Sequence, residues 1–319
     1  MSTRSRGSPF FSTVWWQTAL LLLLLFPASS WARQSVLLVL SQDSQPYQAL
    51  AAALVAQLPA RQWQVNSVLA EQYSPTSVQA DLIVTVGTLA ARDVLQGALH
   101  WPVISVLIPR QTFFALCRQQ HLVVRKEQGL LSAIYLEQPV DRQLQLARLI
   151  DPSIESMGVV LGPNSHDQQP AINAAMAELG WQSRLARFEF NENPIQILEP
   201  LSDNSDAILV VPDKAEFNRS IAKWLLLLSY RRNIPLIGFS SRYVDAGATA
   251  AVFSTPASIA KDTAAWLERW FVQQGQPLPV PSYPHYFEIR TNPEAARSIG
   301  LTLPGMDELE AAMSRDSQP

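Results

Sequence analysis

The sequence predicts an α/β protein with two lobes, each built around a parallel β-sheet, and three observations lead to this fold class. Short apolar runs typical of buried strands alternate with helical stripes along most of the chain, as they do in βαβ units. This alternation divides into two similar halves at about residue 138. The chain has 319 residues, and at about 100–200 residues per domain this length favours two domains.

The first half opens with an unbroken apolar run, Val36–Leu40, as expected for a strand covered on both faces. Pro46 opens a helix whose stripe is Leu50, Leu54 and Leu58, one residue every fourth position. The same alternation then predicts strands over 65–69, 82–86, 103–107 and 134–136, with a further helix from residue 89.

The second half begins with a helix, because Pro139 suits a first turn and Val140, Leu144 and Ile150 form its apolar stripe. The remaining predicted elements are strands over 157–161, 207–211 and 234–239, an alternating segment over 184–190, and helices with stripes at 172–179, 217–228 and 259–270. The proline-rich stretch 277–284 is predicted to be a connector.

The N-terminus has the features of a secretory signal peptide over residues 1–32. Arg4 and Arg6 are followed by the apolar run Ala19–Phe26, and Ser30 and Ala32 provide small residues before a cleavage site. The alternative is an uncleaved anchor, although a spanning helix needs about 20 apolar residues. The predicted location is therefore the periplasm or the exterior, with no cysteine at the cleavage site to accept a lipid.

Composition excludes some classes of function. The net charge is −3 and basic residues form no cluster, which disfavours nucleic-acid binding. The single cysteine, Cys117, cannot form an internal disulfide, so the fold must be stabilised by its apolar core. We predict that this thiol is buried and structural.

Candidate ligand contacts come from the loops that follow the predicted strands, because ligands of parallel α/β sheets bind at the carboxyl ends of strands. Helix N-termini at these loops present free N–H groups that suit an anion. The residues that this rule selects are Ser41, Gln42, Gly87, Thr88, Asn164, Ser165, Asp213 and Ser240.

Each of these positions also has a purely structural interpretation. Gly87 and Thr88 can form an ordinary helix N-cap, and Asp213 can cap the helix that follows it. Asn164 and Ser165 are common turn residues. Both interpretations stay open at this point.

No catalytic or metal-binding set is visible, and we expect no enzyme activity, metal or cofactor. The four histidines have no metal-ligand spacing, and the chain contains no P-loop, G-x-G-x-x-G or G-x-S-x-G motif. His166 and Asp167 adjoin a candidate loop. An exported α/β hydrolase that uses this pair is therefore a less favoured alternative.

Six segments in chain order carry a family resemblance. They are Asp81–Ala91, Trp101–Ile104, Met157–Ser165, Ala207–Lys214, Asn233–Ser240 with Ala246–Ala248, and Arg290–Pro304. Together they resemble the ABC transporter substrate-binding family of periplasmic-binding-protein-like proteins, the group that includes tryptophan and tyrosine binders. The sequence departs from the family pattern at Lys214, at 108–111 and at 252–260, where a glycine is missing.

The resemblance implies a type I periplasmic binding protein, in which two Rossmann-like lobes are joined by three crossovers and hold the ligand between them. On this basis lobe 1 comprises residues 33–137 plus about 250–278, and lobe 2 comprises 138–249 plus about 279–305. Residues 306–319 form a polar tail. The resemblance also implies that Thr88 and Asp213 contact the ligand.

We therefore expect a monomeric periplasmic protein that captures a small polar, amino-acid-like molecule for an ABC permease or another membrane partner. Gly87, Thr88 and the segment Gly162–Ser165 are expected to hold an anionic group, and Asp213 a cationic one. The alternative is a ligand-sensing or interaction module with a degenerate cleft, which serves a sensor or an outer-membrane uptake system.

Overall fold

The structure, a computed structural model, describes residues 33–96, 99–122, 124, 129–188, 192–213, 215–273 and 277–315, with the backbone alone at 215–218, 220 and 315. The predicted signal peptide over 1–32 and Lys214 lie outside the described residues. Within the described part, no helix combines the length and the apolar character that a membrane crossing requires.

Five strands of the described chain form the first sheet, and all of them run parallel in the order β2-β1-β3-β4-β5. They are β1 (Gln34–Leu40), β2 (Trp63–Leu69), β3 (Leu82–Val86), β4 (Val103–Ile108) and β5 (Leu131–Tyr135). Strands β3, β4 and β5 are buried along their whole length, which explains their continuous apolar runs. The strand predicted over 134–136 is β5 in the structure, and it begins earlier, at Leu131, and ends at Tyr135.

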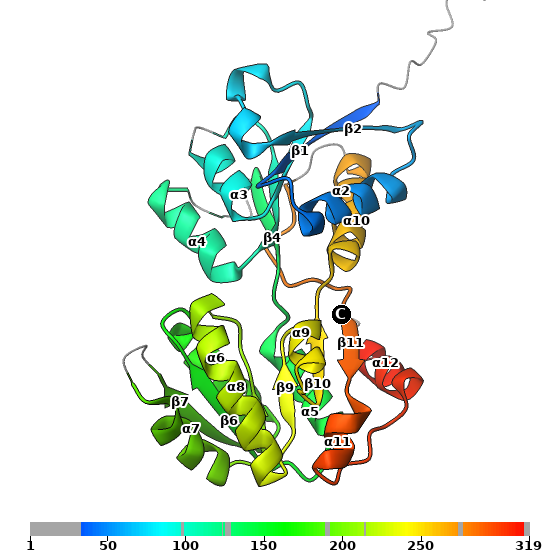
Figure 1. Cartoon of the computed structure of the whole chain (residues 1–319). Coiled ribbons are helices and arrows are strands. Elements are labelled where there is room, and N and C mark those ends of the chain that lie inside the picture. Colours follow the sequence, from blue (N-terminus) through cyan, green and yellow to red (C-terminus); the bar gives the residue numbers. More distant parts are fainter. Residues whose placement is uncertain are drawn as a thin grey trace, which may run out of the picture. The chain divides into compact units, whose positions relative to one another are not determined.

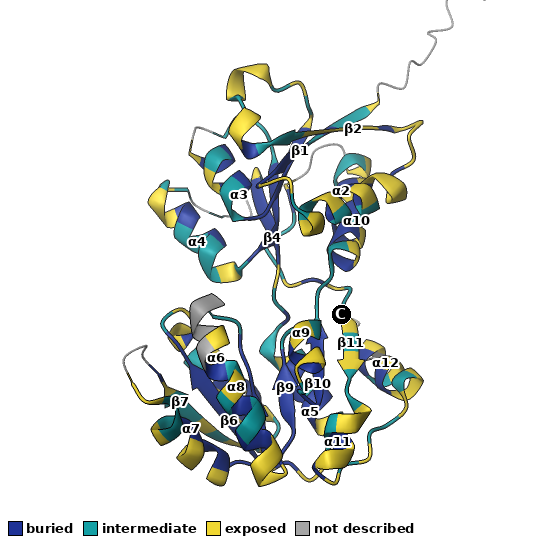
Figure 2. Cartoon of the chain, in the orientation of Figure 1, coloured by how far each residue is buried: buried dark blue, intermediate teal, exposed yellow. Residues whose placement is uncertain are grey.

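Helices cover both faces of this sheet (Figure 1). They are α2 (Gln45–Gln57), α3 (Thr88–Leu95), α4 (Arg110–Gln119) and α10 (Pro256–Val272). Helices α2 and α10 pack on the face that presents Leu38, while α3 and α4 pack on the face that presents Val39. Because successive strand residues point to opposite faces, one apolar run supplies both layers of the core. Figure 2 shows the resulting buried centre of the sheet.

The second sheet contains six strands of the described chain in the order β11-β10-β9-β8-β6-β7, and only β11 is antiparallel to its neighbour. They are β6 (Ser156–Leu161), β7 (Gln182–Arg187), β8 (Ala207–Leu209), β9 (Leu236–Gly238), β10 (Ala250–Phe253) and β11 (Glu288–Thr291). The predicted parallel α/β architecture of both lobes is thus confirmed, with an antiparallel edge strand added.

Helices also flank the second sheet. They are α5 (Val140–Ile150), α6 (Gln169–Glu178), α7 (Pro194–Asp203), α8 (Ala215–Arg232), α9 (Ser241–Asp245), α11 (Pro293–Ser298) and α12 (Met306–Arg315). Helix α12 corrects the predicted polar tail, since Leu309 and Met313 are fully buried in the core of the second lobe, where α12 packs beside α5. These residues lie four positions apart and so share one face of a helix.

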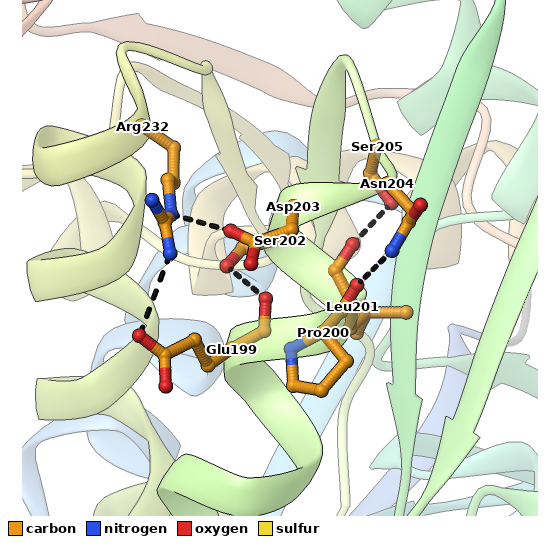
Figure 3. A network of polar contacts seen from close by, with 8 residues as sticks. All are labelled: Glu199, Pro200, Leu201, Ser202, Asp203, Asn204, Ser205 and Arg232. Carbon is orange, nitrogen blue, oxygen red and sulfur yellow. Dashed lines mark hydrogen bonds and ion pairs between the residues drawn. The ribbon is translucent and has the colours of Figure 1, made fainter.

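A polar network joins α7 to the end of α8 (Figure 3). The guanidinium of Arg232 pairs with Asp203 at 2.5 Å and with Glu199 at 3.4 Å. The side chains of Asn204 and Ser205 donate to backbone carbonyls of α7, which satisfies acceptors that a helix C-terminus leaves free. All three members of the ion-pair group are exposed, so the network orients α7 and contributes little to stability.

The described chain passes from one lobe to the other at 136–139, at 254–255 and at 283–287. Before the last passage, Ser282 lies beside β5, donates to the carbonyl of Ala133 and accepts from the N–H of Tyr135, both at 3.0 Å. The structure therefore moves two predicted boundaries. Residues Ala250–Phe253 belong to the second sheet, and residues 279–282 lie against the first.

Candidate functional site

A cavity of about 510 Å³ is lined by loops from both sheets and by two of the three crossovers. Its volume falls within the range of about 300–1,000 Å³ that is usual for small-molecule sites. The lining comes from the starts of α2 (Gln45, Pro46), α4 (Pro109, Gln111, Thr112), α9 (Ser241, Arg242) and α10 (Pro256), the end of β10 (Phe253), other loops of the second sheet (Asn164, Gln168, Pro212, Asp213, Phe239, Ser240) and two crossovers (Leu136, Glu137, Ser254, Thr255). These positions follow strand carboxyl ends, where parallel sheets bind ligands.

The predicted contacts Ser41, Gln42, Gly87 and Thr88 are not part of this lining. Gly87 has a φ of 87°, and a Cβ there would lie 2.6 Å from Ser41 Oγ. The buried Ser41 hydroxyl accepts a hydrogen bond from the N–H of Ala90 at 3.0 Å. Ser41 thus satisfies a free donor at the start of α3, which the sequence reasoning assigned to Thr88. The turn at Gly87 and Thr88 therefore serves to start α3 against Ser41.

The predicted contacts Asn164 and Asp213 do line the cavity. Both carboxylate oxygens of Asp213 accept from the N–H of Asn164, at 3.2 and 3.1 Å, and Oδ2 also accepts from the hydroxyl of Ser165 at 2.5 Å. Ser165 is fully buried, and its Oγ accepts from the N–H of Gly162 at 2.9 Å. Asp213 therefore fixes the loop between β6 and α6.

Ser240 also lines the cavity, as the N-cap residue of α9. Two positions further on, the exposed side chain of Arg242 brings a cation to the same wall. The sequence reasoning stopped at the first residue after the strand and so missed Arg242.

Glu137 is a second cavity residue that the sequence reasoning missed. Its Oε1 accepts from the N–H of Arg110 at 2.8 Å, while Oε2 is buried without a hydrogen-bond partner. Burial raises the pKa of this carboxyl, against a smaller opposing effect of its backbone hydrogen bonds and of Arg110. The rule for strand carboxyl ends could have selected Glu137, since it directly follows the strand predicted over 134–136.

The pair His166 and Asp167 lines an adjoining hollow of about 350 Å³, which shares Gln111, Thr112 and Asn164 with the cavity. There the amide of Gln111 donates to the carboxylate of Asp167, which connects the two lobes. Among the described residues, no group of His, Cys, Asp and Glu side chains is placed to hold a metal ion. Cys117 lies on α4 and is buried in the core against α3, and burial raises the pKa of its thiol to about 11.

A partly buried polar network ties the three crossovers together. Gln138 donates to Ser254 Oγ at 2.7 Å and accepts from Arg142. Arg142 also donates to the carbonyl of Pro284 at 2.9 Å and lies over the ring of Phe287. Because these groups belong to all three passages, the network holds the crossovers as one assembly.

No known protein family profile matches this chain, and no curated protein sequence matches it either. Solved structures do match. A ligand-free, open substrate-binding protein with adhesive properties from Clostridium difficile has a TM-score of 0.67 at 16% identity, over 85% of this chain and 96% of that one.

Two further solved structures match over similar shares of this chain and of their own. An ABC domain in complex with L-Trp from Streptococcus pneumonia has a TM-score of 0.57 at 15% identity, over 87% of this chain and 98% of that one. A conserved domain protein from Vibrio cholerae has a TM-score of 0.56 at 17% identity, over 88% and 98%. At these identities the likeness establishes the fold. The chain has two Rossmann-like lobes in the arrangement of type I periplasmic binding proteins.

Proposed function

We propose that this chain is a solute-binding protein that captures a small polar, amino-acid-like ligand and releases it to a membrane partner. The observation that carries the proposal is the cavity of about 510 Å³, where strand ends of both sheets meet two crossovers. A ligand that contacts both lobes binds their closed arrangement better and shifts the population toward it. The fold shared with a substrate-binding protein and with a tryptophan-bound domain supports this proposal.

The proposed setting is the periplasm, where the protein acts as a monomer after its signal peptide is removed. An ABC importer is the first candidate for the membrane partner, because the family resemblance points to it. No chemical step on the ligand is part of this proposal.

A thermal-shift screen of the purified protein against amino acids, small organic acids and sugars tests the proposal. A ligand that binds only the native state stabilises it by about 2.7 kcal/mol when present at 100 times its Kd. We expect at least one amino-acid-like compound to raise the unfolding temperature in a dose-dependent way. If the whole library leaves that temperature unchanged, the proposal fails and a module with a degenerate cleft is favoured.

A further inference from the structure

The cavity contains three charged side chains among the described residues, Glu137, Asp213 and Arg242. Asp213 is already engaged, since both of its oxygens accept hydrogen bonds from the loop between β6 and α6. The two other charges have opposite sign, and their contacts decide what the cavity can bind.

Glu137 has an unsatisfied acceptor. One oxygen is held by the N–H of Arg110, whereas the other is buried without a partner. A buried polar atom without a hydrogen bond is costly, and more so when it is charged, so native proteins retain few of them without a functional reason. The last side-chain torsion of glutamate is broad, and the carboxylate can turn toward a donor that enters the cavity.

Arg242 supplies a cation that no other side chain engages in the described part of the chain. Within the described chain its guanidinium makes no hydrogen bond, ion pair or ring contact, and the side chain is exposed at the cavity wall. The nearest carboxylate on the same helix, Asp245, is paired with Arg290 at 2.5 Å. A guanidinium binds a carboxylate through two parallel N–H donors.

Most of the remaining wall is apolar or uncharged. Pro46, Leu136, Phe239 and Phe253 supply apolar surface, and serine, threonine and glutamine side chains supply neutral polar groups. A ligand that fits this wall has an apolar body and carries one positive and one negative group.

We propose that Glu137 and Arg242 are the charged anchors of the cavity for an amino-acid-like zwitterion. Arg242 binds the anionic group, and Glu137 binds the protonated amine. This inference rests on the proposed solute-binding function and adds to it the two residues that hold the charged groups of the ligand.

Other ionisable groups near Glu137 affect its charge and are part of the proposal. Arg110 at the start of α4 favours the charged carboxylate, whereas Tyr135 on β5 and Tyr283 in the third crossover face the same region and stay neutral. Burial raises the pKa of Glu137, and a protonated amine beside it would lower that pKa and favour the ionised form. Ligand binding therefore relieves the cost of the unpaired oxygen.

Calorimetric titration of the full chain tests the inference with matched compounds. The probes are phenylalanine, 3-phenylpropionate, which lacks the amine, and 2-phenylethylamine, which lacks the carboxylate, together with the other amino acids and neutral sugars. We expect a zwitterionic amino acid to bind, and the analogues that lack one charged group to bind at least about tenfold more weakly, since a hydrogen bond to a charged group contributes about 1.5–3 kcal/mol.

Two substitutions locate the anchors. Glu137→Gln keeps an acceptor for the N–H of Arg110, and Arg242→Gln removes a side chain without partners, so both variants should fold. Each substitution is expected to weaken binding of the zwitterion at least about tenfold. Glu137→Gln should leave the affinity for the amine-free analogue unchanged, and Arg242→Gln should leave the affinity for the carboxylate-free analogue unchanged. Glu294→Gln and Arg297→Gln, on the exposed surface of α11, are the matched controls.

The outcomes separate this inference from the proposed function. If a sugar binds and no zwitterion does, or if both variants bind the zwitterion as the unchanged protein does, the inference is wrong and the solute-binding function stands. If none of the probes binds, the inference is wrong and the proposed function loses its support as well.

Discussion

Asp213 illustrates how a residue selected for ligand binding can have a structural role at the same position. The sequence places an acid after a buried strand, and the position does line the cavity. Its carboxylate, however, accepts hydrogen bonds from Asn164 and Ser165. These partners precede it by almost fifty positions, and no local pattern reveals them.

Replacement of Asp213 therefore has a predicted effect on stability. Asp213→Ala removes hydrogen bonds to a charged acceptor, each worth about 1.5–3 kcal/mol, so we expect the free energy of unfolding to fall by about 2 kcal/mol without any ligand. Asp213→Asn keeps one carbonyl acceptor and should lose less. Urea unfolding measures both variants, and an unchanged midpoint in Asp213→Ala would disprove this structural role.

Glu137 predicts a pH dependence of stability. Burial raises its pKa in the folded protein, so the native state binds the proton more tightly than the unfolded chain does. Stability attributable to this group is present below its unfolded pKa and declines as the pH rises toward the folded pKa. Glu137→Gln should be more stable than the unchanged protein at neutral pH, and the difference should shrink as the pH falls through this range. Thermal unfolding across pH checks this, and a difference that is constant with pH contradicts it.

At the scale of elements, the sequence predicts strands better than it predicts short helices. Buried parallel strands appear as continuous apolar runs, and the runs at β1, β3 and β4 are found where they were predicted. Helix α4 was missed, although Phe113, Leu116 and Cys117 form its buried stripe. Pro109 and the polar residues after it resemble a loop, and the proline is in fact the N-cap of the helix.

Helix α12 was missed for a different reason. Its sequence is mostly polar, and its few apolar residues have a partner only in the folded lobe. Leu309 is fully buried against the core of the second sheet, so Leu309→Ala is expected to cost about 2–5 kcal/mol. Denaturant unfolding measures this loss, with Glu308→Ala on the exposed side of the same helix as the control. A loss below about 0.5 kcal/mol, typical of surface substitutions, would contradict the burial of Leu309 and support the predicted polar tail.

At the scale of the whole molecule, the alternation of strands and helices is sufficient to predict two parallel-sheet lobes. Each strand–helix–strand unit places its two strands parallel in one sheet, whatever the rest of the chain does. The site depends on contacts that span the chain. Arg110 holds one oxygen of Glu137 and leaves the other without a partner, and Gln138 and Arg142 connect the crossovers. The rule for strand ends therefore selected loops that line the cavity, at Asn164, Asp213 and Ser240, together with loops that do not, at Ser41 and Gly87. It could not show which of their side chains the fold itself uses.

The most direct test of solute binding in this cavity is a crystal structure of the protein with a zwitterionic amino acid that stabilises it. The account predicts ligand density inside the cavity, with the carboxylate at the guanidinium of Arg242 and the amine at Glu137. Density for the ligand at another place, such as the hollow of about 500 Å³ beside His285 and Ser314, would contradict it.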